Sequence, residues 1–210
     1  MLFRAFKRVF DFVSALLLFI VISPLFLVLM ILVRVKLGSP IFFTQERTGL
    51  HQKHFRLIKF RSMTNERDAE GNLLPDEKRQ TKFGGFLRSS SLDELPELLC
   101  IIKGDMSVIG PRPLPPVYDD YYTERELKRF EVRGGLIPPD SVDASAVISW
   151  DKQFEYEAQY AESLSLINDV KIFFNVFKII FQRRNTDYGS FVRKPLSEER
   201  EKQKSIGESK

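Results

Sequence analysis

The most constraining feature of this chain is an N-terminal segment, residues 12–33, that contains no charged residue. At about 1.5 Å per residue, a helix of this length would extend roughly 33 Å, which exceeds the ~30 Å hydrocarbon core of a bilayer. The apolar run is too long for a signal peptide, and no small-residue cleavage site follows it. The segment is therefore predicted to enter a membrane.

Basic residues flank this segment on both sides, so the positive-inside rule assigns it no direction and favours two cytoplasmic ends. They are Arg4, Lys7 and Arg8 before the segment and Arg34 and Lys36 after it. Pro24 lies at the midpoint and lacks the N–H of the helical ladder, and the hydroxyl of Ser23 can satisfy the carbonyl that this frees. We predict a re-entrant helix–break–helix hairpin across residues 1–36. The alternative is a proline-kinked helix that spans the bilayer.

Beyond the membrane segment, the chain has the composition of a folded domain. Its 210 residues include 43% hydrophobic and 29% charged residues, and the net charge of +4 suits an anionic partner, either acidic lipid or nucleic acid. Cys100 is the single cysteine, which excludes an intrachain disulfide and fits a cytoplasmic domain. We predict an α+β, mostly helical domain over residues 37–184 and a polar, solvated tail over residues 185–210.

Local sequence signals predict the main elements of this domain. Residues 40–44 and 54–61 are rich in β-branched and aromatic side chains and predict a short β-hairpin. Thr123 and Glu126 fit a capping box that opens a helix to about Val132. Further helices are predicted at residues 93–103, where Gly104 supplies the C-cap, at residues 150–163 and at residues 166–184.

The helix predicted at residues 166–184 is amphipathic, so it fits a helix that lies in the bilayer interface. The apolar face is assigned to Ile172, Phe173, Val176, Phe177, Ile179 and Ile180, and the polar face to Asp169, Lys171, Asn175, Lys178, Arg183 and Arg184. A core helix is the alternative, because apolar helix faces usually pack on their own domain.

Two adjacent carboxylates, Asp93 and Glu94, are the main candidates for chemistry. They stand where a basic, serine-rich stretch gives way to a predicted helix, whose free N–H groups suit a carboxylate or a phosphate. Arg88, five positions upstream, adds a cation with bidentate phosphate geometry. The structural alternative is helix capping, since Asp93 or a preceding serine can be the N-cap, and Ser91 with Glu94 fits a capping box.

Two other cations accompany the carboxylates. Arg112 stands between Pro111 and Pro113, so its backbone has little entropy to lose on binding, and it is a candidate anion hook rather than part of a stiffened loop. Lys59 lies in the second predicted strand, with Arg61 on the same side. Such residues also occur on a strand as a solvated edge, and that interpretation stays open for both.

Five motifs together resemble a known family, the bacterial sugar transferases, which are monotopic polyprenyl-phosphate phosphoglycosyl transferases. The motifs are Ser23-Pro24 within the apolar segment, residues 59–63, residues 88–98, residues 103–107 and residues 110–113. Each motif alone is weak, but five in the same order and spacing, over about residues 6–133, make a specific resemblance. The short chain is similar to the small catalytic-core members.

The resemblance implies a reaction. A sugar-1-phosphate moves from a UDP-sugar to undecaprenyl phosphate, with release of UMP and a requirement for Mg2+. Asp93 is then the nucleophile that forms an aspartyl-phosphosugar intermediate. Glu94 assists it in metal binding or acid–base work, so that both carboxylates are metal ligands. Lys59, Arg88 and Arg112 bind substrate.

The resemblance also implies a place in the cell. The catalytic domain would lie on the cytoplasmic face of a bacterial inner membrane, in contact with its lipid. There it would carry out the first membrane step of capsule, O-antigen or glycoprotein glycan assembly. Downstream glycosyltransferases are candidate partners, and nucleic acid is not expected as one.

One stretch departs from the family pattern. Members commonly carry Pro-Gly-Ile/Leu-Thr-Gly where residues 134–147 of this chain read differently, so the contacts to the sugar and nucleotide stay unassigned. Two other functions remain as alternatives, a membrane-anchored scaffold without catalysis and a nucleotide-sugar hydrolase. Retention of Asp93, Glu94 and the arginines argues against a scaffold. Dependence of turnover on the lipid acceptor would exclude a hydrolase.

Overall fold

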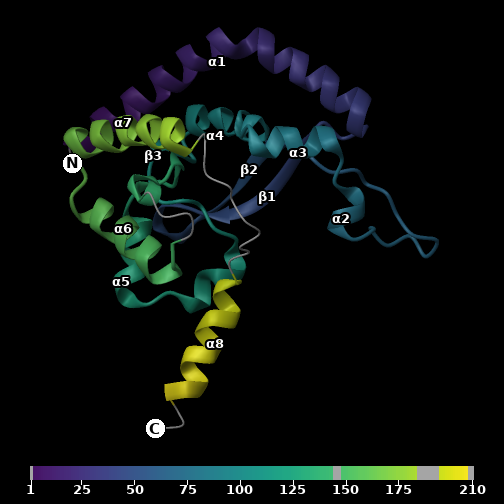
Figure 1. Cartoon of the computed structure of the whole chain (residues 1–210). Coiled ribbons are helices and arrows are strands. Elements are labelled where there is room, and N and C mark those ends of the chain that lie inside the picture. The colour runs from purple at the N-terminus through teal and green to yellow at the C-terminus, as the bar shows by residue number, and fades with distance from the viewer. Residues whose placement is uncertain (1, 144–147, 184–193, 208–210) are drawn as a thin grey trace. The chain divides into compact units, whose positions relative to one another are not determined.

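The computed structural model describes residues 2–143, 148–183 and 194–207. Its architecture is α+β and mostly helical, as predicted (Figure 1). The helices and strands are α1 (Leu2–Leu37), β1 (Phe42–Thr48), β2 (His54–Phe60), α2 (Asp76–Arg79), α3 (Lys82–Ser89), α4 (Glu97–Lys103), β3 (Ser107–Ile109), α5 (Glu124–Leu127), β4 (Gly135–Ile137), α6 (Trp150–Glu162), α7 (Leu166–Arg183) and α8 (Leu196–Gly207).

The chain divides into two compact units. Residues 8–45 and 56–104 form the first, which we call the Asp93 unit. The second, which we call the Arg112 unit, contains residues 46–55, the first seven residues and the chain from Asp105 onward. The candidate carboxylates Asp93 and Glu94 therefore belong to one unit, and the candidate anion-binding residue Arg112 belongs to the other.

Helix α1 passes through Pro24 without interruption, and Figure 1 shows it as a bent but continuous rod. The Ser23 hydroxyl donates a hydrogen bond to the carbonyl of Ile20 at 2.8 Å. Ile20 is four residues before Pro24, so this is the carbonyl that the missing proline N–H leaves free. The predicted hydrogen bond from Ser23 to the freed carbonyl is present, but the predicted break is a bend within one helix. The location of both helix ends on one side of a membrane stays a prediction.

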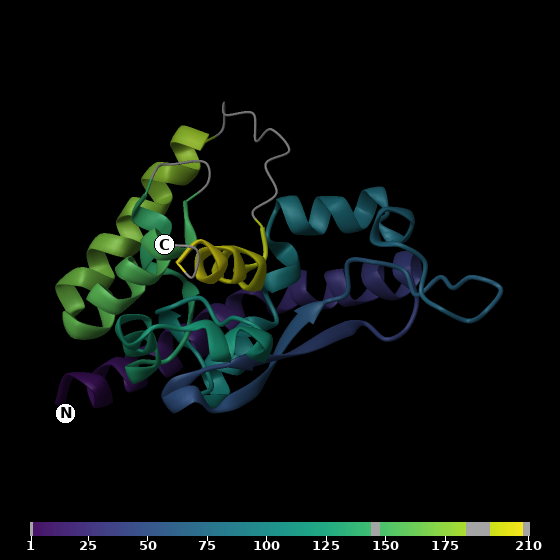
Figure 2. The same cartoon turned by 90° about the horizontal axis from the view of Figure 1, so that it is seen from below.

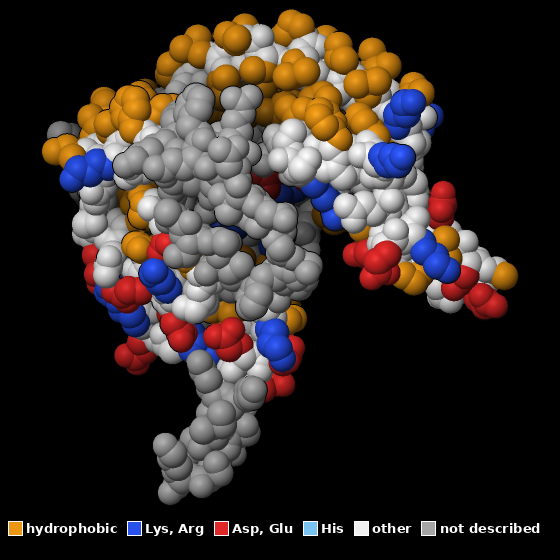
Figure 3. Space-filling model, viewed as in Figure 1, with side chains coloured by type: hydrophobic (Ala, Val, Ile, Leu, Met, Phe, Trp, Pro, Cys, Tyr) orange, Lys and Arg blue, Asp and Glu red, His pale blue; other side chains and the backbone are white. Residues whose placement is uncertain are grey.

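One face of α1 supplies the core of the Asp93 unit. Phe26, Leu29 and Val33 are buried against Phe60 of β2 and Leu87 of α3. The rings of Phe26 and Phe60 lie 4.9 Å apart, centroid to centroid. The remaining faces of the helix expose large apolar side chains, which Figure 3 shows along α1. Among the described residues α1 alone is long and apolar enough to cross a membrane.

The predicted hairpin is present as β1 and β2, with the first strand displaced toward the C-terminus (Figure 2). The strands meet in a tight turn, in which the N–H of Lys53 donates to the carbonyl of Leu50 at 3.2 Å. His51 and Gln52, the two central residues, have φ of 54° and 58°. Two left-handed central residues are typical of the type I′ turn that matches the twist of a hairpin.

Helix α3 was not predicted, because Gly84 and Gly85 obscure its pattern. The Thr81 hydroxyl caps the helix by accepting a hydrogen bond from the N–H of Gly84 at 3.0 Å. A side chain at position 84 would place its Cβ 1.8 Å from the carbonyl oxygen of Ser62. Gly84 therefore allows α3 to lie directly on the backbone that follows β2.

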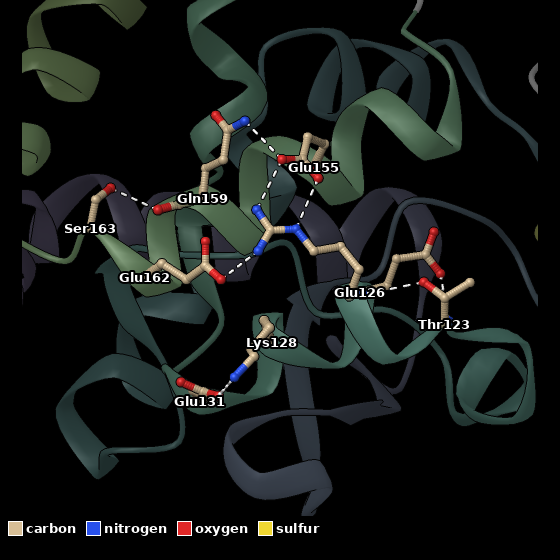
Figure 4. A network of polar contacts seen from close by, with 9 residues as sticks. Thr123, Glu126, Lys128, Glu131, Glu155, Gln159, Glu162 and Ser163 are labelled. Carbon is tan, nitrogen blue, oxygen red and sulfur yellow. Dashed lines mark hydrogen bonds and ion pairs between the residues drawn. The ribbon is translucent and has the colours of Figure 1, made fainter.

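The Arg112 unit is built on a short parallel pair, β3 and β4, in which Ser107 pairs with Gly135 and Ile109 with Ile137. The predicted capping box is present at α5, where Thr123 and Glu126 exchange side chain–backbone hydrogen bonds (Figure 4). Helices α6 and α7 also form where predicted. The core of this unit lies between β3 and these two helices.

The faces of α7 differ from those predicted. Asp169, assigned to the polar face, is buried, and its carboxylate contacts Lys7 Nζ at 2.7 Å and the Tyr160 hydroxyl at 2.6 Å. Ile172, assigned to the membrane face, lies in the core. The exposed apolar side chains are Leu166, Ile167, Val170, Phe173 and Phe174. Contact of this face with a bilayer stays a prediction, and Arg184 and the α7 side chains from Phe177 onward lie outside the described part.

Part of the predicted solvated tail is a docked helix. Leu196 at the start of α8 is fully buried beside Trp150 and Phe154. The Trp150 indole N–H donates to the carbonyl of Lys194 at 3.0 Å, and Arg200 forms ion pairs with Glu126 and Asp151. One apolar residue in a charged segment is too weak a pattern to predict docking. The rest of the predicted tail, residues 185–193 and 208–210, lies outside the described residues.

The turn at His51 and Gln52 yields a stability prediction. Replacing His51→Asn and Gln52→Gly together should raise the free energy of unfolding by about 1 kcal/mol, because these residues adopt positive φ at lower cost. Chemical denaturation of the purified protein measures the change. Lys53→Gly is the matched control, since Lys53 has an ordinary φ of −77° and glycine there should be neutral or destabilising. Equal effects at both places would contradict the explanation.

Candidate active site

Asp93 and Glu94 lie in a short 3₁₀ turn, Leu92–Glu94, that precedes α4. Helix α4 begins at Glu97 with Pro96 as its N-cap, so the helix start predicted at Asp93 is wrong. Neither the turn nor the helix has a side-chain cap hydrogen bond at its N-cap residue, and the proposed capping box of Ser91 and Glu94 is absent. Helix capping therefore does not account for the two carboxylates.

The residue Asp93 is only 9% exposed. Burial raises its pKa above the ordinary value for aspartate, and the charge of Glu94 adds to the increase. Lys59 and Arg88 act in the opposite direction, because their positive charges favour the ionised carboxylate. Asp93 is thus a buried carboxylate whose charge the surrounding cations stabilise only in part.

Lys59 joins β2 to the acidic stretch. Its Nζ contacts Glu94 Oε1 at 2.6 Å and Glu97 Oε1 at 3.2 Å. Lys59 is largely buried in this position and Arg61 is 5% exposed, so neither residue belongs to a solvated strand edge. Glu97 was missed in the sequence, although it follows Glu94 within the same short acidic stretch.

Arg88 is fixed in the last turn of α3. Its Nε donates to the hydroxyl of Ser62 at 2.8 Å, and Ser62 is the residue on whose carbonyl Gly84 rests. The close approach of α3 at Gly84 therefore also fixes the start of the Arg88 side chain. Ser62 belongs to the motif at residues 59–63, but its contact with Arg88 was not predicted, because it joins segments that are distant in the sequence.

Arg112 lies in the Arg112 unit, on the loop that follows β3. It is exposed, whereas Pro111 and Pro113 on either side are buried. Its N–H donates to Glu157 Oε1 at 3.0 Å and its carbonyl accepts from Arg129 at 2.5 Å. Of the predicted site residues, the structure thus brings Lys59, Arg88, Asp93 and Glu94 together in one unit, and Arg112 belongs to the other unit.

The carboxylates offer hard oxygen ligands of the kind that Mg2+ prefers. No group of three or more His, Cys, Asp or Glu residues suited to a metal occurs in the described part of the chain. Mg2+ in phosphate-handling sites typically uses one or two carboxylates together with substrate phosphates and water. Asp93 and Glu94 fit a cation held in that way.

The arrangement suits attack on a phosphorus atom. A carboxylate nucleophile needs its own charge and that of the phosphate screened, and Lys59 and Arg88 supply positive charge at Asp93. A buried, partly dehydrated carboxylate is also more reactive than a hydrated one. These features make Asp93 the candidate nucleophile and Glu94 its polar neighbour.

Comparison with known proteins gives consistent matches. The family described as "Bacterial sugar transferase" matches residues 2–183. The chain is 48% identical over 166 residues to the uncharacterized sugar transferase EpsL of Bacillus subtilis, covering 79% of this chain and 82% of that protein.

Two larger relatives have names that state a reaction. The chain is 34% identical to the UDP-glucose:undecaprenyl-phosphate glucose-1-phosphate transferase of Klebsiella pneumoniae, covering 82% of this chain and 40% of that protein. It is 30% identical to the undecaprenyl-phosphate galactose phosphotransferase of Salmonella typhimurium, covering 86% of this chain and 41% of that protein. The chain therefore spans less than half the length of these two relatives.

The raised pKa of Asp93 predicts a stability effect with a definite sign. The stability that Asp93 contributes is present below its unfolded pKa and lost as pH rises through the higher folded pKa. Asp93→Asn should therefore increase the melting temperature at neutral pH, and the gain should shrink as the pH falls toward 4, roughly the unfolded pKa. Thermal unfolding across that range measures it.

Glu94→Gln is the matched control for this measurement. Glu94 is paired with Lys59 at 2.6 Å, so its neutralisation should lower stability by about 1–3 kcal/mol. A destabilised Asp93→Asn at neutral pH would contradict the assignment of Asp93 as a strained, buried charge.

Proposed function

This chain belongs to the bacterial sugar transferase family, and we propose that it transfers a sugar-1-phosphate from a UDP-sugar to undecaprenyl phosphate. The observation that carries the proposal is the buried Asp93 carboxylate, whose pKa is raised beside Lys59 and Arg88. The printed names of the Klebsiella and Salmonella relatives supply the substrate class. They name glucose for one protein and galactose for the other, so the sugar taken by this chain is left to experiment.

The proposed chemistry has two steps. In the first, an oxygen of Asp93 forms a bond to the phosphorus that carries the sugar, the bond to the UMP oxygen breaks, and UMP leaves with the electron pair. In the second, a phosphate oxygen of undecaprenyl phosphate attacks the same phosphorus, and the Asp93 carboxylate leaves. One carboxylate can thus serve two very different substrates in turn.

The surrounding residues have separate proposed roles. Arg88 and Arg112 bind the phosphates, for which the planar guanidinium is well shaped. Lys59 binds substrate and holds Glu94, the polar partner of Asp93. Asp93 and Glu94 would hold Mg2+, which supplies Lewis-acid screening of the diphosphate charge.

The two alternative functions predict different outcomes in the same assay. A scaffold would release no UMP, and a hydrolase would release it steadily without a lipid acceptor. Burial of Asp93 argues against a scaffold, because a buried carboxylate with a raised pKa lowers stability at neutral pH and binding to a partner does not require one.

The first prediction of the proposal is a covalent adduct. Wild-type protein mixed with a UDP-sugar alone should gain the mass of one phosphosugar and release one equivalent of UMP, whereas Asp93→Asn should do neither. Intact-mass spectrometry across a panel that begins with UDP-glucose and UDP-galactose measures this. Adding undecaprenyl phosphate should remove the adduct.

Glu77→Gln, which alters an exposed carboxylate of α2, is the control for the adduct experiment and should behave as wild type. An adduct on a residue other than Asp93 would overturn the nucleophile assignment. UMP release that continues without the lipid acceptor would identify a hydrolase instead.

We further propose that α1 enters the cytoplasmic face of a bacterial inner membrane and returns to it. Basic residues precede and follow the apolar stretch, and the hydrogen bond from Ser23 to Ile20 masks the carbonyl freed at the bend. Replacing Ser23→Ala and Pro24→Leu together removes the cause of the bend and leaves a straight apolar helix of spanning length. Part of that population should then place its N-terminus in the periplasm.

A cysteine introduced at position 2 and labelled with a membrane-impermeant reagent in spheroplasts measures this topology. A cysteine at Glu70, in an exposed loop, is the control for cytoplasmic sites and should stay unlabelled. The native Cys100 is buried and should not interfere. Labelling of position 2 in an otherwise wild-type chain would show a spanning helix and contradict the re-entrant topology.

A further inference from the structure

The backbone of Arg112 is held by a buried ion pair that the proposed chemistry does not use. Arg129 Nε lies 2.8 Å from Glu157 Oε2, and the two side chains are 1% and 0% exposed. Glu157 Oε1 accepts the N–H of Arg112 at 3.0 Å, and the Arg129 guanidinium donates to the carbonyl of Arg112 at 2.5 Å. The backbone N–H and carbonyl of the exposed Arg112 therefore both form hydrogen bonds with the same buried ion pair.

Two further side chains form hydrogen bonds with the pair. Arg129 donates to the Tyr122 hydroxyl at 2.7 Å, and Gln153 donates to Glu157 at 3.0 Å. The Arg129 guanidinium carbon lies 5.2, 5.1 and 5.2 Å from the ring centroids of Tyr122, Phe130 and Phe154. The guanidinium is thus enclosed by three aromatic rings, which fix its position and that of the pair.

The loop that carries Arg112 is fixed on its other side as well. The N–H of Gly135 donates to the carbonyl of Pro111 at 2.9 Å. A side chain at Gly134 would place its Cβ 2.5 Å from a ring carbon of Pro113. Both prolines are buried, and the backbone N–H and carbonyl of Arg112 are both hydrogen-bonded. The backbone conformation at Arg112 is therefore fixed, and its exposed side chain extends from a rigid loop.

Stability alone gives no reason to keep such a pair. Well-packed apolar residues of similar volume are often as stable as a buried ion pair, because removing two charges from water is costly. An apolar pair, however, could not bond the N–H and carbonyl of Arg112. We propose that Arg129 and Glu157 are positioning residues that orient Arg112 toward the diphosphate of the nucleotide-sugar, an inference that rests on the function proposed above.

The decisive variant is Arg129→Met with Glu157→Leu. It removes both charges together, so that neither is left buried and unpaired, and the protein should stay folded. The KM for the UDP-sugar should rise about 10- to 100-fold, as expected for losing a charge-assisted phosphate contact. The kcat should change little, because a phosphate contact made before and during the reaction affects mainly substrate binding.

Arg125→Met is the matched control. Arg125 lies in the segment that leads to Arg129 and also pairs with α6, through Glu155 and Glu162, which are labelled in Figure 4. Its contacts are exposed, and exposed ion pairs contribute little to stability. Removing an arginine here should leave KM unchanged.

A double-mutant cycle separates positioning from general damage. In an Arg112→Ala background, the Arg129→Met and Glu157→Leu changes should have no further effect on KM, because the residue they orient is gone. If the two changes raised KM by the same factor in the Arg112→Ala background, the inference would be overturned, because the pair would then act on the fold as a whole. An unchanged KM in the original background would overturn it too.

Hydrogen exchange tests the same inference without turnover. The amide of Arg112 should exchange slowly in wild type and faster in the variant lacking the pair, with Arg125→Met resembling wild type. Equal exchange in all three proteins would overturn the inference. If wild type releases no UMP from any UDP-sugar, the proposed function fails, and the exchange measurement still decides whether the pair holds Arg112.

Discussion

Each unit depends on ion pairs that compensate charged side chains buried on folding. In the Asp93 unit, one lysine of β2 contacts Glu94 and Glu97. In the Arg112 unit, Arg129 pairs with Glu157 in a site closed to solvent. An uncompensated buried charge would cost several kcal/mol, so these contacts specify which segments must meet. Strand β2 is tied to the carboxylates before and at the start of α4, and the segment after α5 is tied to α6.

The negative charge of Asp93 is only partly compensated by its neighbours. Burial raises its pKa although two cations act against the shift, which means that the ionised carboxylate is less stable here than in water. Glu94, one residue later, has a direct cationic partner. Two adjacent carboxylates thus have different environments, and such a difference allows one to react while the other supports it.

Local patterns predicted those features for which one short segment contains both partners. The capping box of Thr123 and Glu126, the glycine cap at Gly104 and the bond from Ser23 to the freed carbonyl are of this kind. Contacts between distant segments could not be predicted. Gly84 argues against a helix when the sequence is considered alone. Its presence in α3 is explained only by the close contact with the Ser62 carbonyl. Asp169 belongs to the core because Lys7 reaches it from the other end of the chain.

Helix α1 and the candidate site share one scaffold within the Asp93 unit. Phe60 of β2 and Leu87 of α3 are the most deeply buried of the residues that pack on the buried face of α1. Lys59 immediately precedes Phe60, and Arg88 immediately follows Leu87. In a strand and in a helix, neighbouring side chains point in different directions. When Phe60 or Leu87 packs on α1, the side chain of the adjacent cation therefore points away from α1. Both cations that act on Asp93 are therefore placed by the apolar contacts that seat α1, and a displacement of that helix would change the charge around the carboxylate.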